Sequence, residues 1–167
     1  AGDPVAMMRP GNKLASYELL AAALSRIASV DWELVVVGDG AARSAVEATF
    51  AGIDPLRLRF VGAQSGDRVA ALLRQSDLFL WPAIDEVIGM AFVEAQACGL
   101  PVVGGLTRGV ASVVAADRTG ILVPAGDIEA FAAATTRLAT DEELRERMGR
   151  EAVAYVRARH DLPAAAA

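Results

Sequence analysis

Short apolar runs and longer amphipathic runs alternate along the whole chain, and this alternation restricts the fold more than any other feature. The short runs are almost entirely apolar, which is typical of parallel strands covered on both faces. Segment 14–28 places Leu20, Leu24 and Ile27 at the spacing of a helix with one buried face. We expect strands at 5–8, 34–37, 58–61, 78–81, 102–103 and 121–123. We expect helices at 14–28, 41–50, 67–75, 89–97, 110–115, 128–138 and 142–159, the last two capped by Asp127 and Asp141.

Alternating strands and helices predict a single α/β Rossmann-like domain with a parallel sheet of about six strands and helices on both faces. The length of 167 residues suits one domain, and a hydrophobic content of 54% with only 5% aromatics suits helices packed closely on a sheet. In such folds ligands bind at the carboxyl ends of the strands. This rule selects the strand-to-helix segments 9–13, 38–40, 62–66, 82–89 and 104–109.

The overall charge argues against some classes of partner. A net charge of -5 does not favour nucleic acid or an anionic membrane, so a bound anion would need a local arrangement of cations. No apolar run reaches the ~18–20 residues of a membrane span, and we expect no integral membrane segment. The single cysteine, Cys98, allows no internal disulfide and indicates a reducing compartment. The expected location is the cytoplasm, with peripheral association with the inner membrane left open for a full-length protein.

The segment VVVGDG ends a predicted strand with a G-x-G pattern. The third glycine of a dinucleotide fingerprint is replaced by Arg43, and no acidic residue follows about 20 positions later. Binding of NAD or FAD is therefore disfavoured. Two interpretations remain: a tight turn with Asp39 capping the next helix, or an open glycine surface at Gly38 that a ligand can approach closely.

The loop 9-RPGNK-13 carries two cations between the first strand and the first helix. The guanidinium of Arg9 offers a fork of donors that matches phosphate oxygens, and Lys13 offers a point charge. This pair predicts an anion site, and the alternative is two solvated loop charges.

The stretch WPAIDEVIGMAFVEAQACGLPVV is strongly apolar, yet it contains Glu86 and Glu94. In a continuous helix these would lie about 80° apart around the axis and ~12 Å apart along it, too far for a glycosidase pair. Segment 87–89 instead predicts a turn, which leaves Glu86 in a loop and Glu94 about one turn inside a helix. The helix start between them would present free N–H groups to an anion, and each carboxylate could accept from vicinal hydroxyls. The alternative is two surface carboxylates without a ligand.

Five segments together carry a family resemblance: VVVGDG, RLRFVGA, EVIGMAFVEAQACGLPVV, TGILVPAGD and DEELRERMG. In this order they resemble the donor-binding, C-terminal half of retaining glycosyltransferases of the GT-B fold, family 4 type, also called glycosyl transferases group 1. The resemblance covers almost the whole chain. It implies that residues 1–167 form a nucleotide-sugar-binding domain and that the N-terminal acceptor domain of the family is absent.

The resemblance also implies roles for individual residues. Arg9 and Lys13 would hold the diphosphate, Glu86 would contact the donor sugar, and Glu94 would bind the ribose hydroxyls. The catalytic residues implied are Glu86, Arg9 and Lys13. The substrate-binding residues implied are Glu94, Ile88, Gly89, Met90, Gly62, Ala63, Gln64, Gly38 and Arg108. No metal or other cofactor is expected, because cations and the helix start would neutralise the leaving diphosphate.

The activity implied is transfer of a hexosyl group from a nucleoside diphosphate sugar to a glycan, lipid or small-molecule acceptor held by the missing domain. The isolated domain is expected to bind the donor without transferring it. The alternatives are a nucleotide-sugar epimerase of the same fold and a non-catalytic nucleotide-sugar-binding module. Val87 replaces the family's usual glycine, and Arg108 and Ser112 depart from its G-G-x-P-E segment, so the donor base and sugar stay open.

Overall fold

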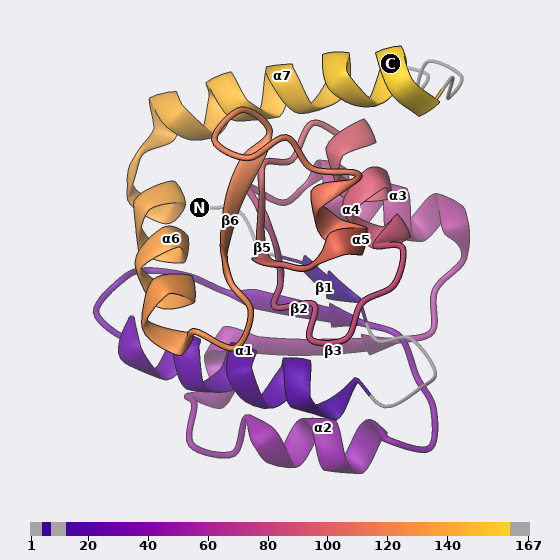
Figure 1. Ribbon diagram of the computed structural model, residues 1–167. Coiled ribbons are helices and arrows are strands. Elements are labelled where there is room, and N and C mark those ends of the chain that lie inside the picture. The colour runs from indigo at the N-terminus through magenta and orange to yellow at the C-terminus, as the bar shows by residue number, and fades with distance from the viewer. Residues whose placement is uncertain (1–4, 8–12, 161–167) are drawn as a thin grey trace.

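The computed structural model describes residues 5–7 and 13–160, which form an α/β domain around one six-stranded parallel sheet (Figure 1). The strand order is β3-β2-β1-β4-β5-β6. The strands are β1 (Val5–Met7), β2 (Leu34–Val37), β3 (Leu58–Gly62), β4 (Phe79–Trp81), β5 (Val102–Leu106) and β6 (Gly120–Pro124). The predicted Rossmann-like fold with about six parallel strands is confirmed.

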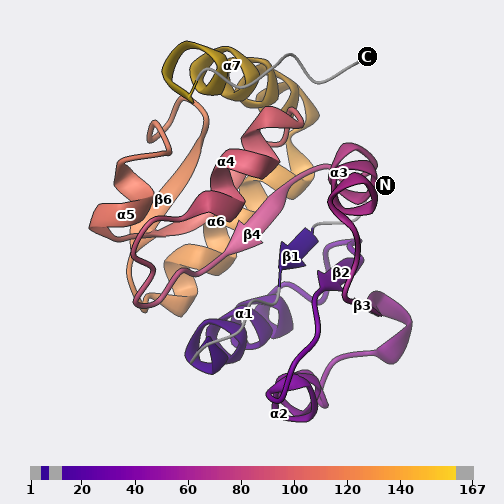
Figure 2. The same ribbon diagram turned by 90° about the vertical axis from the view of Figure 1, so that its right-hand side faces the viewer.

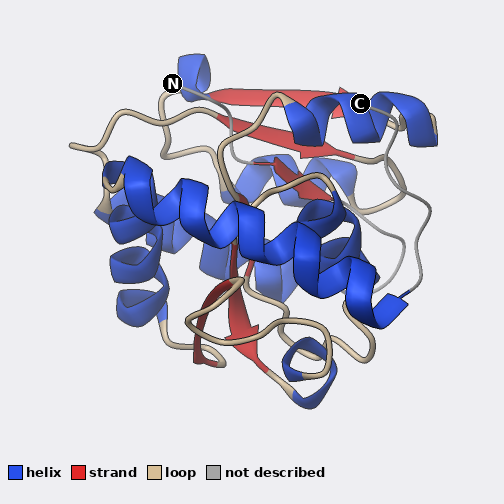
Figure 3. Ribbon diagram, turned by 90° about the horizontal axis from the view of Figure 1, so that it is seen from above, coloured by secondary structure: helices blue, strands red, loops and turns tan. Residues whose placement is uncertain are grey.

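Helices cover both faces of this sheet, as the apolar strands require. The helices are α1 (Leu14–Arg26), α2 (Arg43–Thr49), α3 (Gly66–Arg74), α4 (Met90–Ala97), α5 (Arg108–Ala111), α6 (Ile128–Thr140) and α7 (Glu142–His160), with a 3-10 turn at Pro55–Arg57. Helix α1 packs beside α2 and α6 on one face, whereas α3 and α4 lie together on the other (Figure 2). Helix α7 contacts both α4 and α6 and lies across the molecule in the view from above (Figure 3). None of the described helices is long and apolar enough to cross a lipid bilayer.

The predicted N-caps of α6 and α7 are confirmed, and the predicted N-cap of α2 is not. The Asp127 carboxylate accepts from the Ala130 N–H at 2.9 Å, and that of Asp141 accepts from the Leu144 N–H at 2.9 Å. The Asp39 cap is wrong, because α2 begins after Ala42 without a side-chain cap. The Asp39 carboxylate instead accepts from the Gly40 N–H at 2.8 Å.

The region after β5 differs most from the prediction. The expected strand 102–103 extends to Leu106, so the expected loop at 104–109 is reduced to Thr107 between the strand and α5. Gly104 and Gly105 continue the strand because they pair in register with Leu122 and Val123 of β6. Helix α5 begins two residues earlier than predicted, since the Thr107 hydroxyl accepts from the Val110 N–H at 3.3 Å.

The strand order predicts where a ligand would bind on the sheet. Strand β1 pairs with β2 on one side and with β4 on the other, so the chain reverses its direction of winding there. Crevices in open α/β sheets form outside the carboxyl ends of strands at such a switch point. The segments that follow β1 and β4 are therefore the first candidates for a site.

Gly105 allows β5 to approach the residue that follows β4. A Cβ atom at position 105 would lie 2.1 Å from the carbonyl oxygen of Pro82, a backbone atom that cannot swing aside. We predict that Gly105→Ala lowers the free energy of unfolding by about 3 kcal/mol in urea unfolding. Gly52→Ala is the matched control, because nothing lies within 4 Å of a Cβ there, and it should change stability by less than about 0.5 kcal/mol. Equal effects of the two substitutions would contradict this packing argument.

Candidate functional site

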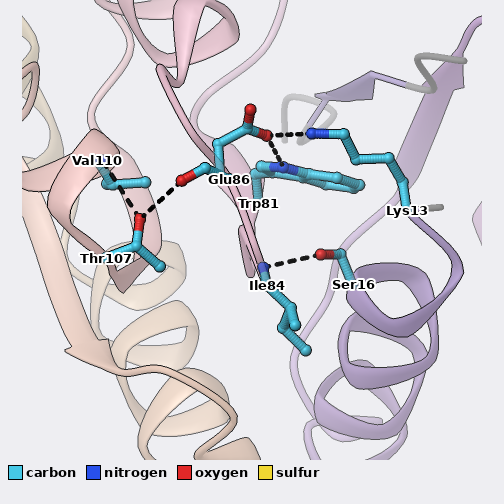
Figure 4. Close-up of polar contacts among 7 residues, drawn as sticks. All are labelled: Lys13, Ser16, Trp81, Ile84, Glu86, Thr107 and Val110. Carbon is cyan, nitrogen blue, oxygen red and sulfur yellow. Dashed lines mark hydrogen bonds and ion pairs between the residues drawn. The ribbon is translucent and has the colours of Figure 1, made fainter. Parts of the chain in front are cut away.

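Glu86 lies in the loop between β4 and α4, called the 82–89 loop below, as the sequence predicted. Its Oε2 atom accepts from the Nζ of Lys13 at 2.6 Å and from the indole N–H of Trp81 at 3.2 Å (Figure 4). The two charged side chains are largely buried, with exposed fractions of 21% for Lys13 and 19% for Glu86. The structure therefore joins one predicted cation and one predicted carboxylate across the switch point.

The surroundings of Glu86 keep it ionised. Partial burial raises the pKa of Glu86, but hydrogen bonds from Lys13, Trp81 and the Gly89 backbone, with the charge of Lys13, lower it further, so the net pKa lies below its ordinary value. A carboxylate that is charged and held on one oxygen can accept hydrogen bonds but cannot donate its own proton at neutral pH.

The 82–89 loop has an unusual backbone that neighbouring elements hold in place. Ala83 and Asp85 have φ angles of 56° and 59°, which are unfavourable for residues with a side chain. Helix α1 fixes the loop through the buried Ser16 hydroxyl, which accepts from the Ile84 N–H at 3.0 Å. From the other side, the Gly105 N–H donates to the Pro82 carbonyl at 3.1 Å.

The start of α5 packs directly against the residues around Glu86. The Thr107 hydroxyl donates to the Glu86 carbonyl at 3.5 Å (Figure 4). A Cβ at Gly109 would lie 2.2 Å from the carbonyl oxygen of Val87, so only glycine fits there. Val87 itself has no left-handed backbone and its side chain is 80% exposed. The 82–89 loop therefore accommodates valine at position 87, where the family usually has glycine.

Helix α4 starts beside Glu86, as predicted. Gly89 is its N-cap residue, with a left-handed φ of 69° and no side-chain cap for the helix start. The Gly89 N–H faces the Glu86 carboxylate and helps to lower its pKa. Ile88 and Met90, on either side, have exposed side chains, and Glu94 lies half-buried in the second turn.

The other predicted residues occupy the neighbouring strand ends. The Gly38 N–H donates to the Gly62 carbonyl at 2.8 Å, which joins the loops after β2 and β3. The Gln64 side chain donates back to the Val61 carbonyl at 2.5 Å, and Ala63 is exposed. Arg43 forms ion pairs with Asp39 at 3.3 Å and Glu47 at 2.8 Å.

Of the other two predicted cations, the structure describes only Arg108. Arg9 lies outside the described residues, so its role stays a prediction. Arg108 is the first residue of α5 and is exposed, beside the close contact of Gly109 with Val87. The described contacts join Lys13 to Glu86, and Gly38 to Gly62.

Sequence reasoning missed three residues that shape the site. The sequence pattern places Trp81 in an apolar strand, Ser16 in a helix and Thr107 in a longer loop, and indicates no role for any of them. Only the position of Trp81, immediately before Pro82 at a strand end, could have drawn attention to it. The contacts of Ser16 and Thr107 span 68 and 21 residues, and no local pattern contains them.

The comparisons with known proteins decide the family. A family model described as Glycosyl transferases group 1 matches residues 11–154. The chain belongs to this family. The match confirms the resemblance drawn from EVIGMAFVEAQACGLPVV, which contains Glu86 and Glu94, and from the four other segments.

Curated relatives from bacteria share part of their sequence with this glycosyltransferase-family chain. It is 35% identical over 127 residues to N-acetyl-alpha-D-glucosaminyl L-malate synthase of Bacillus anthracis, which is 75% of this chain and 33% of that protein. It is 36% identical over 106 residues to D-inositol 3-phosphate glycosyltransferase of Corynebacterium efficiens, which is 64% of this chain and 25% of that protein. The chain thus spans about a third or less of the length of these relatives.

Solved structures share the fold at lower identity. Sucrose-phosphate synthase from Thermosynechococcus elongatus superposes with a TM-score of 0.80 at 24% identity, over 94% of this chain and 41% of that one. Anabaena Alr3699/HepE in complex with UDP-glucose superposes with a TM-score of 0.80 at 21% identity, over 95% and 44%. These similarities support the same fold for the family member described here.

The lowered pKa of Glu86 predicts a pH dependence of stability. A carboxylate whose folded-state pKa lies below its ordinary value of 4.5 contributes stability above about pH 4.5, and this contribution is lost as the pH falls through the folded-state pKa. The stability difference between the wild type and Glu86→Gln should therefore be largest near neutral pH and shrink below about pH 4.5. Urea unfolding at a series of pH values measures this difference. Glu143→Gln, at an exposed position of α7, is the control for the loss of a carboxylate without buried partners. A difference that stayed constant from pH 7 to pH 3 would show that the contacts of Glu86 do not depend on its charge.

Proposed function

We propose that this chain is the nucleotide-sugar-binding domain of a retaining glycosyltransferase that moves a hexosyl group from a nucleoside diphosphate sugar to an acceptor. The observation that carries the proposal is the Lys13–Glu86 pair at the β1/β4 switch point, beside the uncapped start of α4. A cation, a carboxylate and a helix start together match the phosphates and hydroxyls of such a donor.

Each group has a defined part in this proposal. Lys13 and Arg9 bind the diphosphate and stabilise the negative charge that develops as it leaves. Glu86 accepts a hydrogen bond from the donor sugar, and Glu94 accepts from the ribose hydroxyls. The backbone amides at Ile88, Gly89 and Met90 line the sugar and phosphates. Residues Gly38, Gly62, Ala63 and Gln64 form the edge on which the nucleoside lies, and Arg108 flanks the site.

The acceptor would bind outside this chain, in the N-terminal domain that family members carry. Because the chain spans only part of its relatives, the isolated domain should bind donor without transferring the sugar. We further propose that no metal takes part, since Lys13, Arg9 and the α4 start supply the positive potential. The relatives described above carry synthase or glycosyltransferase names, and no observation favours the epimerase alternative.

The ribose role of Glu94 is tested by ligand-induced stabilisation. A ligand that prefers the folded state raises the melting temperature. UDP-glucose is the first donor to test, since a protein of similar fold was solved with it, followed by GDP- and ADP-sugars. We expect one of these nucleotide sugars to raise the melting temperature of the wild type and to leave Glu94→Ala unchanged. The exposed helix residue Glu143 supplies the control Glu143→Ala, which should respond like the wild type. If Glu94→Ala were stabilised as strongly as the wild type, Glu94 would not bind the ribose.

Lys13 is tested by comparing ligands with and without phosphates. Replacement by methionine removes the charge but keeps most of the apolar stem, so Lys13→Met should weaken binding of UDP about tenfold or more. Binding of uridine, which lacks the diphosphate, should change less than about twofold. Calorimetric titration measures both, with Arg150→Met on exposed α7 as the control for a lost positive charge. A parallel loss for UDP and uridine would place Lys13 outside the phosphate site.

A further inference from the structure

Trp81 is more deeply buried than Lys13, the other described side chain that bonds to Glu86. It is the last residue of β4, and its side chain is buried with only 3% exposed. Its ring packs edge to face against the buried Tyr17 of α1, with centroids 4.9 Å apart and planes at 70°. This packing holds the indole N–H toward Oε2 of Glu86, to which it donates at 3.2 Å.

Lys13 differs from Trp81 in its flexibility and its positive charge. Lys13 is the N-cap residue of α1, and its ammonium group lies at the end of a flexible four-carbon side chain. This group carries the positive charge that attracts a diphosphate. A bound diphosphate and Glu86 therefore compete for the same ammonium group. The indole is a neutral donor on a buried ring, so a phosphate attracts it less than it attracts the ammonium group.

We propose that Trp81 is a positioning residue, whose indole N–H keeps the Glu86 carboxylate in place for the donor sugar when the diphosphate draws Lys13 away. The inference rests on the proposed function and adds a residue to it. Both described side-chain contacts use Oε2, and the other oxygen points away from Lys13 and Trp81, as Figure 4 shows. A carboxylate has about four acceptor positions, so with donors from Lys13, Trp81 and the Gly89 backbone it can still accept from a sugar hydroxyl.

Substitution by phenylalanine separates the hydrogen bond from the packing. Trp81→Phe keeps an aromatic ring against Tyr17 and removes only the donor and part of the volume. The matched control is Trp32→Phe, because Trp32 is also buried and its indole N–H donates to the Ile27 carbonyl at 3.1 Å, on the amino-terminal side of β2. Both substitutions should lower the free energy of unfolding by similar amounts, but only Trp81→Phe removes a hydrogen bond to Glu86.

Binding of UDP-glucose and of UDP is measured by calorimetric titration for the wild type and both variants. We expect Trp81→Phe to weaken UDP-glucose about tenfold, the loss of one hydrogen bond to a charged group, and to change UDP less than about twofold. Trp32→Phe should leave the ratio of the two affinities unchanged. Equal losses for UDP and UDP-glucose, or no loss for either, would overturn the inference.

The indole hydrogen bond itself is observable without ligand. The chain has two tryptophans, so its proton–nitrogen correlation spectrum should contain two indole signals, and Trp32→Phe identifies the signal of Trp81. Glu86→Gln should move the Trp81 signal and leave that of Trp32 in place. A Trp81 signal that did not respond to Glu86→Gln would overturn the inference even if Trp81→Phe failed to fold.

The two proposals fail in different ways. If the wild type bound neither UDP-glucose nor any other nucleotide sugar, the proposed function would fail and the role of Trp81 would fall with it. If the wild type bound UDP-glucose and Trp81→Phe bound it equally well, only the positioning role would be wrong.

Discussion

The close backbone contact between the 82–89 loop and the β5–α5 turn is the constraint on which the candidate site depends. Gly105 and Gly109 each lie where a Cβ would overlap a carbonyl oxygen, of Pro82 and Val87 respectively. Their missing side chains let two neighbouring strand ends come together. This contact supports the strained backbone at Ala83 and Asp85, whose energetic cost must be offset by the surrounding structure. The position of the Glu86 carboxylate follows from that support.

We propose that the Lys13–Glu86 ion pair contributes more to ligand binding than to the stability of the fold. A partly exposed ion pair such as Lys13–Glu86 contributes little net free energy of folding, because desolvation offsets much of the attraction. The same pair keeps a carboxylate ionised and a cation oriented beside the switch point of the sheet. Groups that are oriented before a ligand arrives need little rearrangement when charge develops in a reaction. The indole of Trp81 extends this argument, since its orientation is fixed by packing rather than by charge.

The sequence predicts much of this architecture because the strands are apolar and the turns are punctuated by glycine and proline. Helix α4 and the loop position of Glu86 follow from the turn-forming 87–89 segment and the apolar helix after it. The sequence predicts too short a strand β5, because two consecutive glycines are typical of a loop. Their pairing with β6, which keeps them in the strand, is visible only in the fold. The Lys13–Glu86 contact joins residues 73 apart and depends on β1 lying beside β4, which no local pattern contains. Trp81 is hidden for another reason: a buried aromatic residue in a strand is usually core, and its hydrogen bond to a loop carboxylate follows only from the fold.

We propose that the donor binds between the 82–89 loop and the start of α1, with its diphosphate at Lys13. A crystal structure of the chain with UDP-glucose would show where the nucleotide sugar lies. We expect the diphosphate between Lys13 and the start of α4, the ribose hydroxyls at Glu94, and the glucose at Glu86, with the indole N–H of Trp81 still bonded to that carboxylate. A nucleotide bound elsewhere, or a diphosphate that leaves Lys13 and the α4 start uncontacted, would contradict this proposal.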